Sequence, residues 1–142
     1  MTPEQIGLVQ SSFERLGPRL PALATLFYSE LFARDPDLRA LFTTDMAVQK
    51  VRFAEKLTEI VRAIPRLGEL LAHTHALGAR HVSYGARAAD YRTVGDALIA
   101  ALAAELGEGF DDQTRHAWLM AYNLVAETML DGAASTRPVM SS

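Results

Sequence analysis

The stretch Leu77 to Gly85, LGARHVSYG, places a histidine near the end of a predicted buried helix. Helical periodicity puts His81 on the same face as Leu70, Thr74 and Leu77, so that its imidazole points toward the apolar interior. From spacing alone three interpretations stay open: a core histidine satisfied by a backbone carbonyl, an exposed residue at a helix end, or a metal ligand. The rest of the chain has to distinguish between them.

The composition limits the function classes. The chain has 142 residues, of which 49% are hydrophobic and 22% are charged, as expected for one globular domain with a substantial core. A formal net charge of -3 offers no field for a phosphate backbone, so no nucleic-acid partner is expected. The absence of cysteine excludes disulfides and thiolate metal sites. Because there is neither a signal-peptide pattern nor an apolar run near the ~18 residues of a membrane span, we expect a cytoplasmic protein without membrane insertion.

Apolar stripes at helical spacing, separated by proline and glycine, cover most of the chain. They predict helices over about 3–16, 20–34, 46–64, 67–83, 88–106 and 111–132, with short helical turns around 38–42. No segment alternates with period two, and no repeat is present. We therefore predict an all-α fold of six to eight helices, with the domain over residues 1–132 and a flexible C-terminal tail over residues 133–142.

The residues around His81 limit which kind of metal site it could belong to. No second histidine, cysteine or carboxylate lies at chelating spacing on its helix face, which disfavours a zinc site built from protein ligands alone. A single inward imidazole suits a metal whose other ligands come from elsewhere, and a porphyrin supplies four. From position alone, three further residues have simple structural interpretations: Gln49 as an exposed residue of a first helical turn, Tyr28 as a core tyrosine bonded to a carbonyl, and Phe42 as a core aromatic.

The chain resembles bacterial single-domain globins, which are similar to the haem domain of flavohaemoglobins. The resemblance covers about residues 2–129 and rests on LFYSELFARDPDLRALF (26–42), MAVQKVRF (46–53), LGARHVSYG with the following YRTVGDALIAAL (91–102), and AWLMAYNLVAETM (117–129). It implies a globin fold around a pocket for haem b, with His81 as the proximal iron ligand. It also implies that Phe42 packs against the porphyrin and that Tyr91 supports the proximal side. A glutamate that flavohaemoglobins carry in the last helix has no counterpart here, where the register reaches Ser135.

The resemblance further implies a distal side formed by Tyr28, Gln49 and Phe53. A phenol and an amide can both donate hydrogen bonds to dioxygen, which carries partial negative charge when bound, whereas CO carries little. The implied function is reversible binding of O2, with CO and NO as further ligands. A nitric oxide dioxygenase activity is expected to need an external reductase, because the sequence has no GxGxxG fingerprint. The alternative is a helical regulatory or haem-sensing module that acts through a protein partner.

Overall fold

The computed structural model describes residues 1–42, 45–66 and 88–136, and every regular element in these ranges is a helix. The predicted all-α fold is confirmed, whereas the predicted helix over 67–83 lies outside the described residues. The α-helices are α1 (Pro3–Leu16), α2 (Leu20–Arg34), α3 (Met46–Ala63), α5 (Ala88–Leu106) and α6 (Asp112–Thr136). Short 3-10 helices cover Gly17–Arg19, Pro36–Leu41 and Gly107–Gly109.

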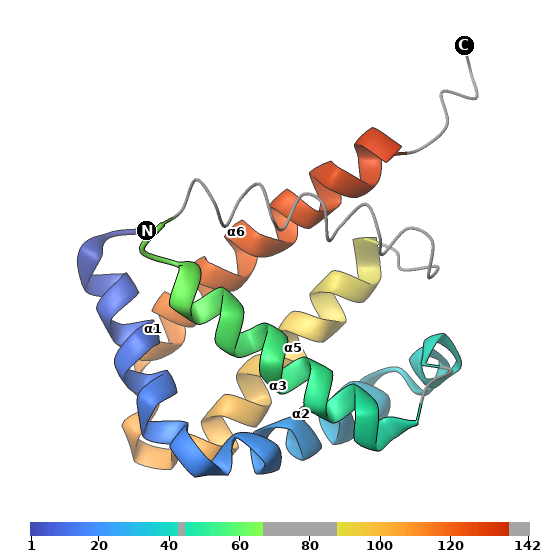
Figure 1. Ribbon diagram of the computed structural model, residues 1–142, viewed down its shortest axis with the longest axis horizontal. Helices are drawn as coiled ribbons and strands as arrows, with labels where there is room; N and C mark the ends of the chain where they lie inside the picture. The colour runs from blue at the N-terminus through green and yellow to red at the C-terminus, as the bar shows by residue number, and fades with distance from the viewer. Residues whose placement is uncertain (43–44, 67–87, 137–142) are drawn as a thin grey trace.

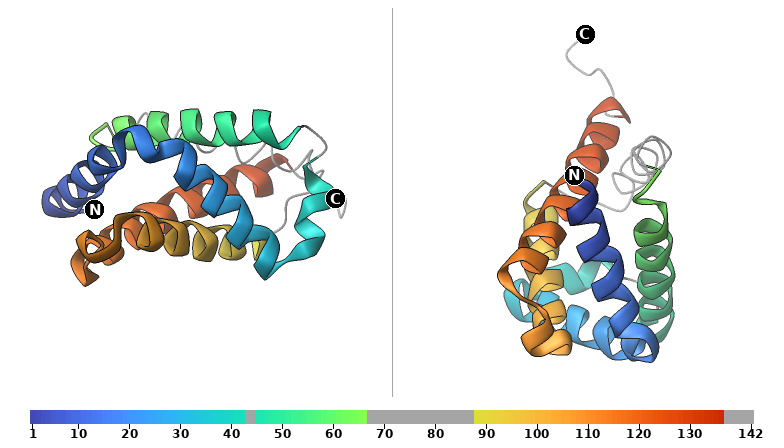
Figure 2. Two further views of the ribbon diagram at one scale, coloured as in Figure 1. Left: turned by 90° about the horizontal axis from the view of Figure 1, so that it is seen from below. Right: turned by 90° about the vertical axis from the view of Figure 1, so that its left-hand side faces the viewer.

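The helices cross one another in pairs rather than running as a parallel bundle (Figure 1). Helix α2 packs against both α3 and α5, and α1 packs against α6. Figure 2 shows α3 on one side of the molecule and the pair α5 and α6 on the other. Helix α2 runs between these two sides, and its buried residues are Leu23, Ala24, Phe27, Tyr28 and Leu31.

Local sequence signals account for where the helices begin and end. Thr2 accepts a hydrogen bond from the backbone N–H of Gln5, whose side chain in turn accepts one from the backbone N–H of Thr2, a complete capping box. Asp45 caps α3 by accepting from the backbone N–H of Ala47 at 2.8 Å. Gly17 follows α1 with a φ of 41°, a conformation that side chains disfavour, so α1 ends there.

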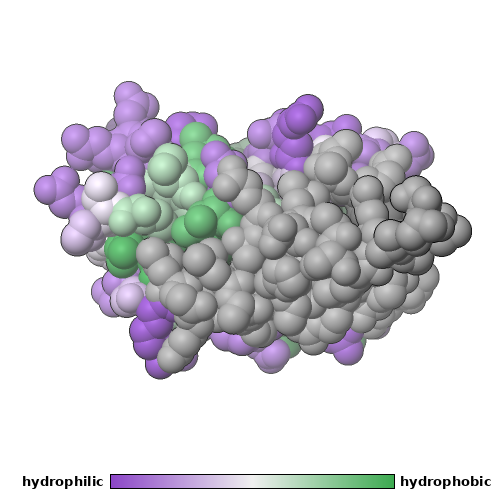
Figure 3. Space-filling view, turned by 90° about the horizontal axis from the view of Figure 1, so that it is seen from above, coloured by the Kyte–Doolittle hydropathy of each residue, from purple (hydrophilic) through white to green (hydrophobic). Residues whose placement is uncertain are grey.

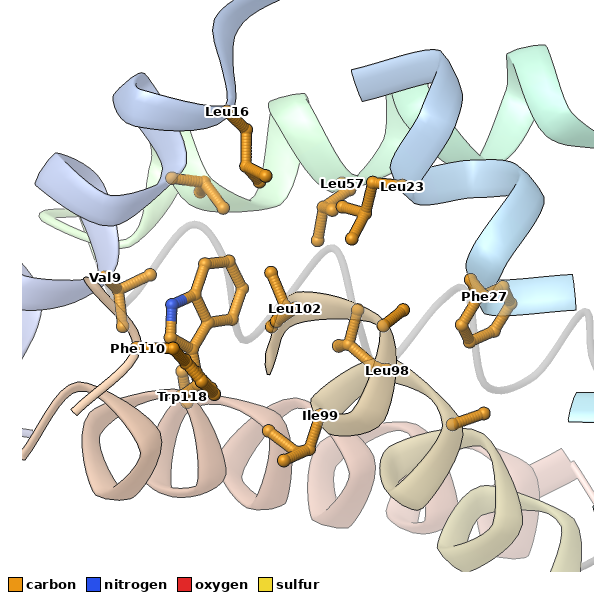
Figure 4. Close-up of a cluster of buried hydrophobic side chains, with 14 of the residues drawn as sticks. Val9, Leu16, Leu23, Phe27, Leu57, Leu98, Ile99, Leu102, Phe110 and Trp118 are labelled. Atoms are coloured by element: carbon orange, nitrogen blue, oxygen red, sulfur yellow. The ribbon is translucent and has the colours of Figure 1, made fainter. Parts of the chain in front are cut away.

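The apolar core lies where α1, α2, α3, α5 and α6 meet (Figure 4). Its buried members include Val9, Leu16, Leu23, Phe27, Leu57, Leu98, Leu102, Phe110 and Trp118. One buried polar link crosses this core: the indole N–H of Trp118 donates to Ser12 Oγ at 2.8 Å. The Ser12 hydroxyl lies 2.7 Å from the carbonyl oxygen of Leu8 and 3.0 Å from that of Val9. The link therefore ties α6 to α1.

Replacing Ser12 with alanine should lower the stability of the fold. The change removes the acceptor of the buried Trp118 N–H, and an unsatisfied buried donor costs about 1–3 kcal/mol. Urea unfolding followed by circular dichroism measures the difference. Ser11→Ala is the matched control, because Ser11 is an exposed residue of the same helix and its replacement should stay within about 0.5 kcal/mol. Equal stability of the two variants would contradict a contribution of the Trp118–Ser12 bond.

The surface also carries apolar groups. Figure 3 shows a face on which apolar residues gather left of centre, with hydrophilic residues to their left and above them. In the part of the chain that the structure describes, the exposed large hydrophobic residues are Val48 and Val51 on α3 and Leu119 and Met120 on α6. None of the described helices is long and apolar enough to cross a bilayer.

Candidate functional site

Five aromatic residues from α2, α3 and the segment that joins these helices pack against one another; we call them the aromatic cluster. Its members are Phe27, Tyr28, Phe32, Phe42 and Phe53. The rings of Phe27 and Phe53 stack with their centroids 4.3 Å apart and an interplanar angle of 13°. The Tyr28 ring meets Phe27, Phe42 and Phe53 edge-on at centroid distances of 5.0, 5.6 and 5.9 Å. Such edge contacts are favourable for aromatic rings, so Tyr28 is held in one orientation at the centre of the cluster.

The Tyr28 hydroxyl is the polar group of this cluster. Only 6% of the residue is exposed, and its hydroxyl donates to the main-chain carbonyl oxygen of Gln49 at 3.4 Å. That distance is long, because O–H···O bonds usually measure about 2.7–2.8 Å. Desolvation raises the pKa of Tyr28 to about 12. The hydroxyl therefore stays protonated at neutral pH, and it is held by a weak bond that a better acceptor could replace.

Gln49 meets Tyr28 through its main chain. Its backbone N–H donates to the carbonyl oxygen of Asp45 at 3.0 Å, as expected in the first turn of α3. The residue is half-buried, so the interpretation as an exposed first-turn residue is not supported. The structure thus sets the Tyr28 side chain against the main chain of Gln49 and the rings of Phe42 and Phe53.

Tyr91 belongs to a different part of the interior. It lies in the first turn of α5, is 8% exposed, and packs with Ala126 of α6 in a small buried group separate from the main core. Burial and, to a lesser degree, the charge of Asp90 raise the pKa of Tyr91. Its main-chain carbonyl accepts a hydrogen bond from the Tyr122 hydroxyl. The sequence placed Tyr122 only in the apolar stripe of the last helix, and this bond to α5 was missed.

His81, the predicted proximal ligand, lies outside the described residues. Among the residues that are described, no group of three or more histidine, cysteine, aspartate or glutamate side chains could hold a metal ion. The aromatic cluster offers instead the hydroxyl of Tyr28, a buried donor surrounded by apolar rings. A polar group placed among aromatic side chains is typical of small-molecule sites.

A known protein family matches most of the chain. A family model described as Globin matches residues 25–129, a range that includes the aromatic cluster and Tyr91. The chain is 25% identical over 134 residues to the flavohemoprotein of Vibrio cholerae, covering 92% of this chain and 34% of that protein. It is 29% identical over 133 residues to the flavohemoprotein of Bordetella pertussis, covering 92% and 33%.

A second kind of relative matches over nearly its whole length. The neuroglobin of Danio rerio is 27% identical over 142 residues, which cover 90% of this chain and 89% of the neuroglobin. The chain therefore spans about a third of the flavohemoproteins that it matches, and about nine-tenths of this neuroglobin. Both kinds of relative match at least nine-tenths of this chain.

Proposed function

The chain belongs to the globin family, and we propose that it binds haem b and, through it, dioxygen reversibly. Membership of the globin family supports the binding of haem and of a diatomic gas. When bound, haem supplies an iron atom at which a diatomic gas can be held. The observation that carries the proposal is the weakly bonded, protonated Tyr28 hydroxyl inside an otherwise apolar aromatic cluster.

The described residues fit this group on its distal side. Phe42 and Phe53 offer ring surfaces for contact with the porphyrin, and both are partly buried against the core. Because the wall that they form is apolar, it excludes water from the ligand and strengthens any hydrogen bond made there. His81 would supply the proximal nitrogen and Tyr91 would support it, both of which rest on the resemblance.

Tyr28 provides the main donor in this proposal. Its O–H would leave the Gln49 carbonyl, 3.4 Å away, and point to the outer atom of the ligand. A partly charged ligand such as dioxygen accepts a stronger bond than a neutral carbonyl does. The Gln49 side-chain amide would be a second, supporting donor. These donors favour O2 over CO, because bound CO offers little charge to accept a hydrogen bond.

We propose that nitric oxide is a further reactant at the same place. Turnover of nitric oxide and dioxygen to nitrate consumes an electron in every cycle. The 142 residues carry no GxGxxG fingerprint, so this electron would come from a reductase that lies outside them. The flavohemoprotein relatives support a reaction with nitric oxide only in part, because the chain covers about a third of their length.

The absorption spectrum tests the proposed function directly. The purified chain, reconstituted with haem, should show a Soret band that shifts when the iron is reduced and CO is added. Titration to a sharp end point of one haem per chain is the expected result. A spectrum that equals free haem at every ratio would contradict the proposal and leave the haem-free form of the alternative, a helical module that acts through a partner.

A further inference from the structure

The guanidinium group of Arg39 lies over the ring of Phe32, the last member of the aromatic cluster on α2. The central guanidinium carbon Cζ stands 4.7 Å from the ring centroid, within the ~6 Å over which the face of an aromatic ring attracts a cation. Arg39 is exposed and Phe32 is half-buried, so the cation covers the outer part of the cluster. In the part of the chain that the structure describes, Arg39 forms no ion pair with a carboxylate. The charge of Arg39 is therefore directed at the ring.

The main chain of Arg39 holds a second member of the cluster. Its carbonyl oxygen accepts a hydrogen bond from the backbone N–H of Phe42 at 3.1 Å. Phe42 directly follows the 3-10 helix Pro36–Leu41, and its φ of -105° and ψ of 89° are not helical, so this bond ties it to the end of that helix. The buried Leu38 anchors the same 3-10 helix in the core. Arg39 therefore contacts Phe42 through its main chain and Phe32 through its side chain.

Phe32 connects the Arg39 side chain to the inner part of the cluster. Its ring centroid lies 5.7 Å from that of Phe42, at an interplanar angle of 73°, and 5.9 Å from that of Tyr28, at 31°. The rings of Tyr28 and Phe42 also meet each other, edge-on at 5.6 Å. The three rings thus form a closed set of mutual contacts. Because closely packed side chains transmit a displacement to their neighbours, a shift of Phe32 would move both Tyr28 and Phe42.

We propose that Arg39 is a positioning residue for the distal side of the haem site: by holding Phe32 and the main chain of Phe42, it sets the orientation of Tyr28 and the place of the Phe42 ring. The proposal rests on the proposed function, in which Tyr28 donates to the bound gas and Phe42 contacts the porphyrin. Arg39 itself needs to touch neither the gas nor the haem. Its side-chain contribution depends on charge, because the negative face of an aromatic ring attracts a cation and not a neutral group.

The test compares three variants of the haem-loaded protein. Arg39→Met keeps a long side chain over Phe32 and removes its charge, whereas Arg39→Lys keeps the charge. Arg34→Met is the matched control, because Arg34 is an exposed arginine at the end of α2 that pairs with Glu30 at 3.5 Å instead of with a ring. Each variant is examined by infrared spectroscopy of the C–O stretch of bound CO, which responds to polar groups near the ligand, by O2 dissociation, by the rate of haem loss to a scavenger, and by thermal melting.

We expect Arg39→Met to shift or broaden the C–O band and to speed O2 dissociation and haem loss about two- to fivefold, the change in rate that corresponds to an exposed contact between a cation and a ring. Arg39→Lys should fall between Arg39→Met and the unaltered protein, and Arg34→Met should leave the band and both rates unchanged. A lower melting temperature of Arg39→Met with an unmoved band and unchanged rates would overturn the proposal and reduce the contact to packing. Failure of the unaltered protein to bind haem and CO would instead overturn the proposed function.

Discussion

Replacing His81 with glycine is expected to abolish stable haem binding, or to make it dependent on added imidazole. His81 is the one inward histidine that the sequence predicts, and removing its ring leaves the iron without a protein ligand. A ligand that binds only the folded state adds RT ln(1 + [L]/Kd) to stability, about 4 kcal/mol when its free concentration is 1,000 times Kd. The variant should therefore lose both the Soret band and most of the stabilisation that haem provides, as spectroscopy and melting with and without haem will show.

Two controls separate loss of the ligand from loss of the fold. His116→Ala changes an exposed histidine of α6 and should keep the Soret band. Imidazole added to His81→Gly fills the space of the missing ring and should restore the band if the rest of the pocket is intact. An unchanged Soret band and haem content in His81→Gly without imidazole would exclude His81 as the proximal ligand.

The sequence predicted the helices well where short-range signals set them. The capping threonine with its proline neighbour, the capping Asp45 and the glycine after α1 act within a few residues, so α1 and α3 begin where the sequence places them. The end of α6 is less local. Its apolar stripe ends at Gly132, yet the helix continues to Thr136, because a glycine tolerates a helical conformation at a modest cost. The division into a domain and a tail stays a prediction.

The candidate site could be predicted only in part. The resemblance to a family, and not the residue types alone, singled out Tyr28, Gln49, Phe42 and Phe53, and the structure sets the Tyr28 side chain against the Gln49 main chain and the rings of Phe42 and Phe53. Their roles toward haem stay proposals, as does that of His81. The bond from Tyr28 to the Gln49 main chain could not be read from the sequence, because every residue has a carbonyl and only the crossing of α2 and α3 selects this one.

The Tyr122 ring lies directly on Gly95 of α5, where an added Cβ atom would stand 2.6 Å from the ring atom Cε2, and this contact was missed for a similar reason. A tyrosine in an apolar stripe is common, and the nature of its partner depends on how α6 crosses α5. One signal was nevertheless present: a glycine in the interior of a helix costs stability relative to alanine, so it can mark a place where another side chain comes close. Gly95 could have been singled out on that ground, but its partner could not have been named.

Replacing Tyr28 with phenylalanine should speed dioxygen dissociation about ten- to 150-fold. The change removes one hydroxyl and keeps the ring, so the edge contacts with Phe27, Phe42 and Phe53 remain. A hydrogen bond to a charged acceptor contributes roughly 1.5–3 kcal/mol, which gives this range of rates. In the unaltered protein, the Tyr28 hydroxyl can return to the Gln49 carbonyl when dioxygen leaves. The hydroxyl therefore adds less to the equilibrium affinity for dioxygen than the full free energy of its hydrogen bond to dioxygen. The weakness of that 3.4 Å bond keeps the reduction small.

Carbon monoxide and a Gln49 variant separate a lost hydrogen bond from a loosened pocket. CO dissociation from Tyr28→Phe should change much less than O2 dissociation, because bound CO offers the hydroxyl little charge. Gln49→Leu should have a smaller effect on the rate of O2 dissociation. The free-energy change in the double variant should be smaller than the sum of the two single changes, because both donors bond to the same ligand. Stopped-flow ligand replacement measures all of these rates. Equal acceleration of O2 and CO would indicate a loosened pocket, and an O2 rate within twofold of the unaltered protein would leave Tyr28 as a core tyrosine whose hydroxyl serves only the Gln49 carbonyl.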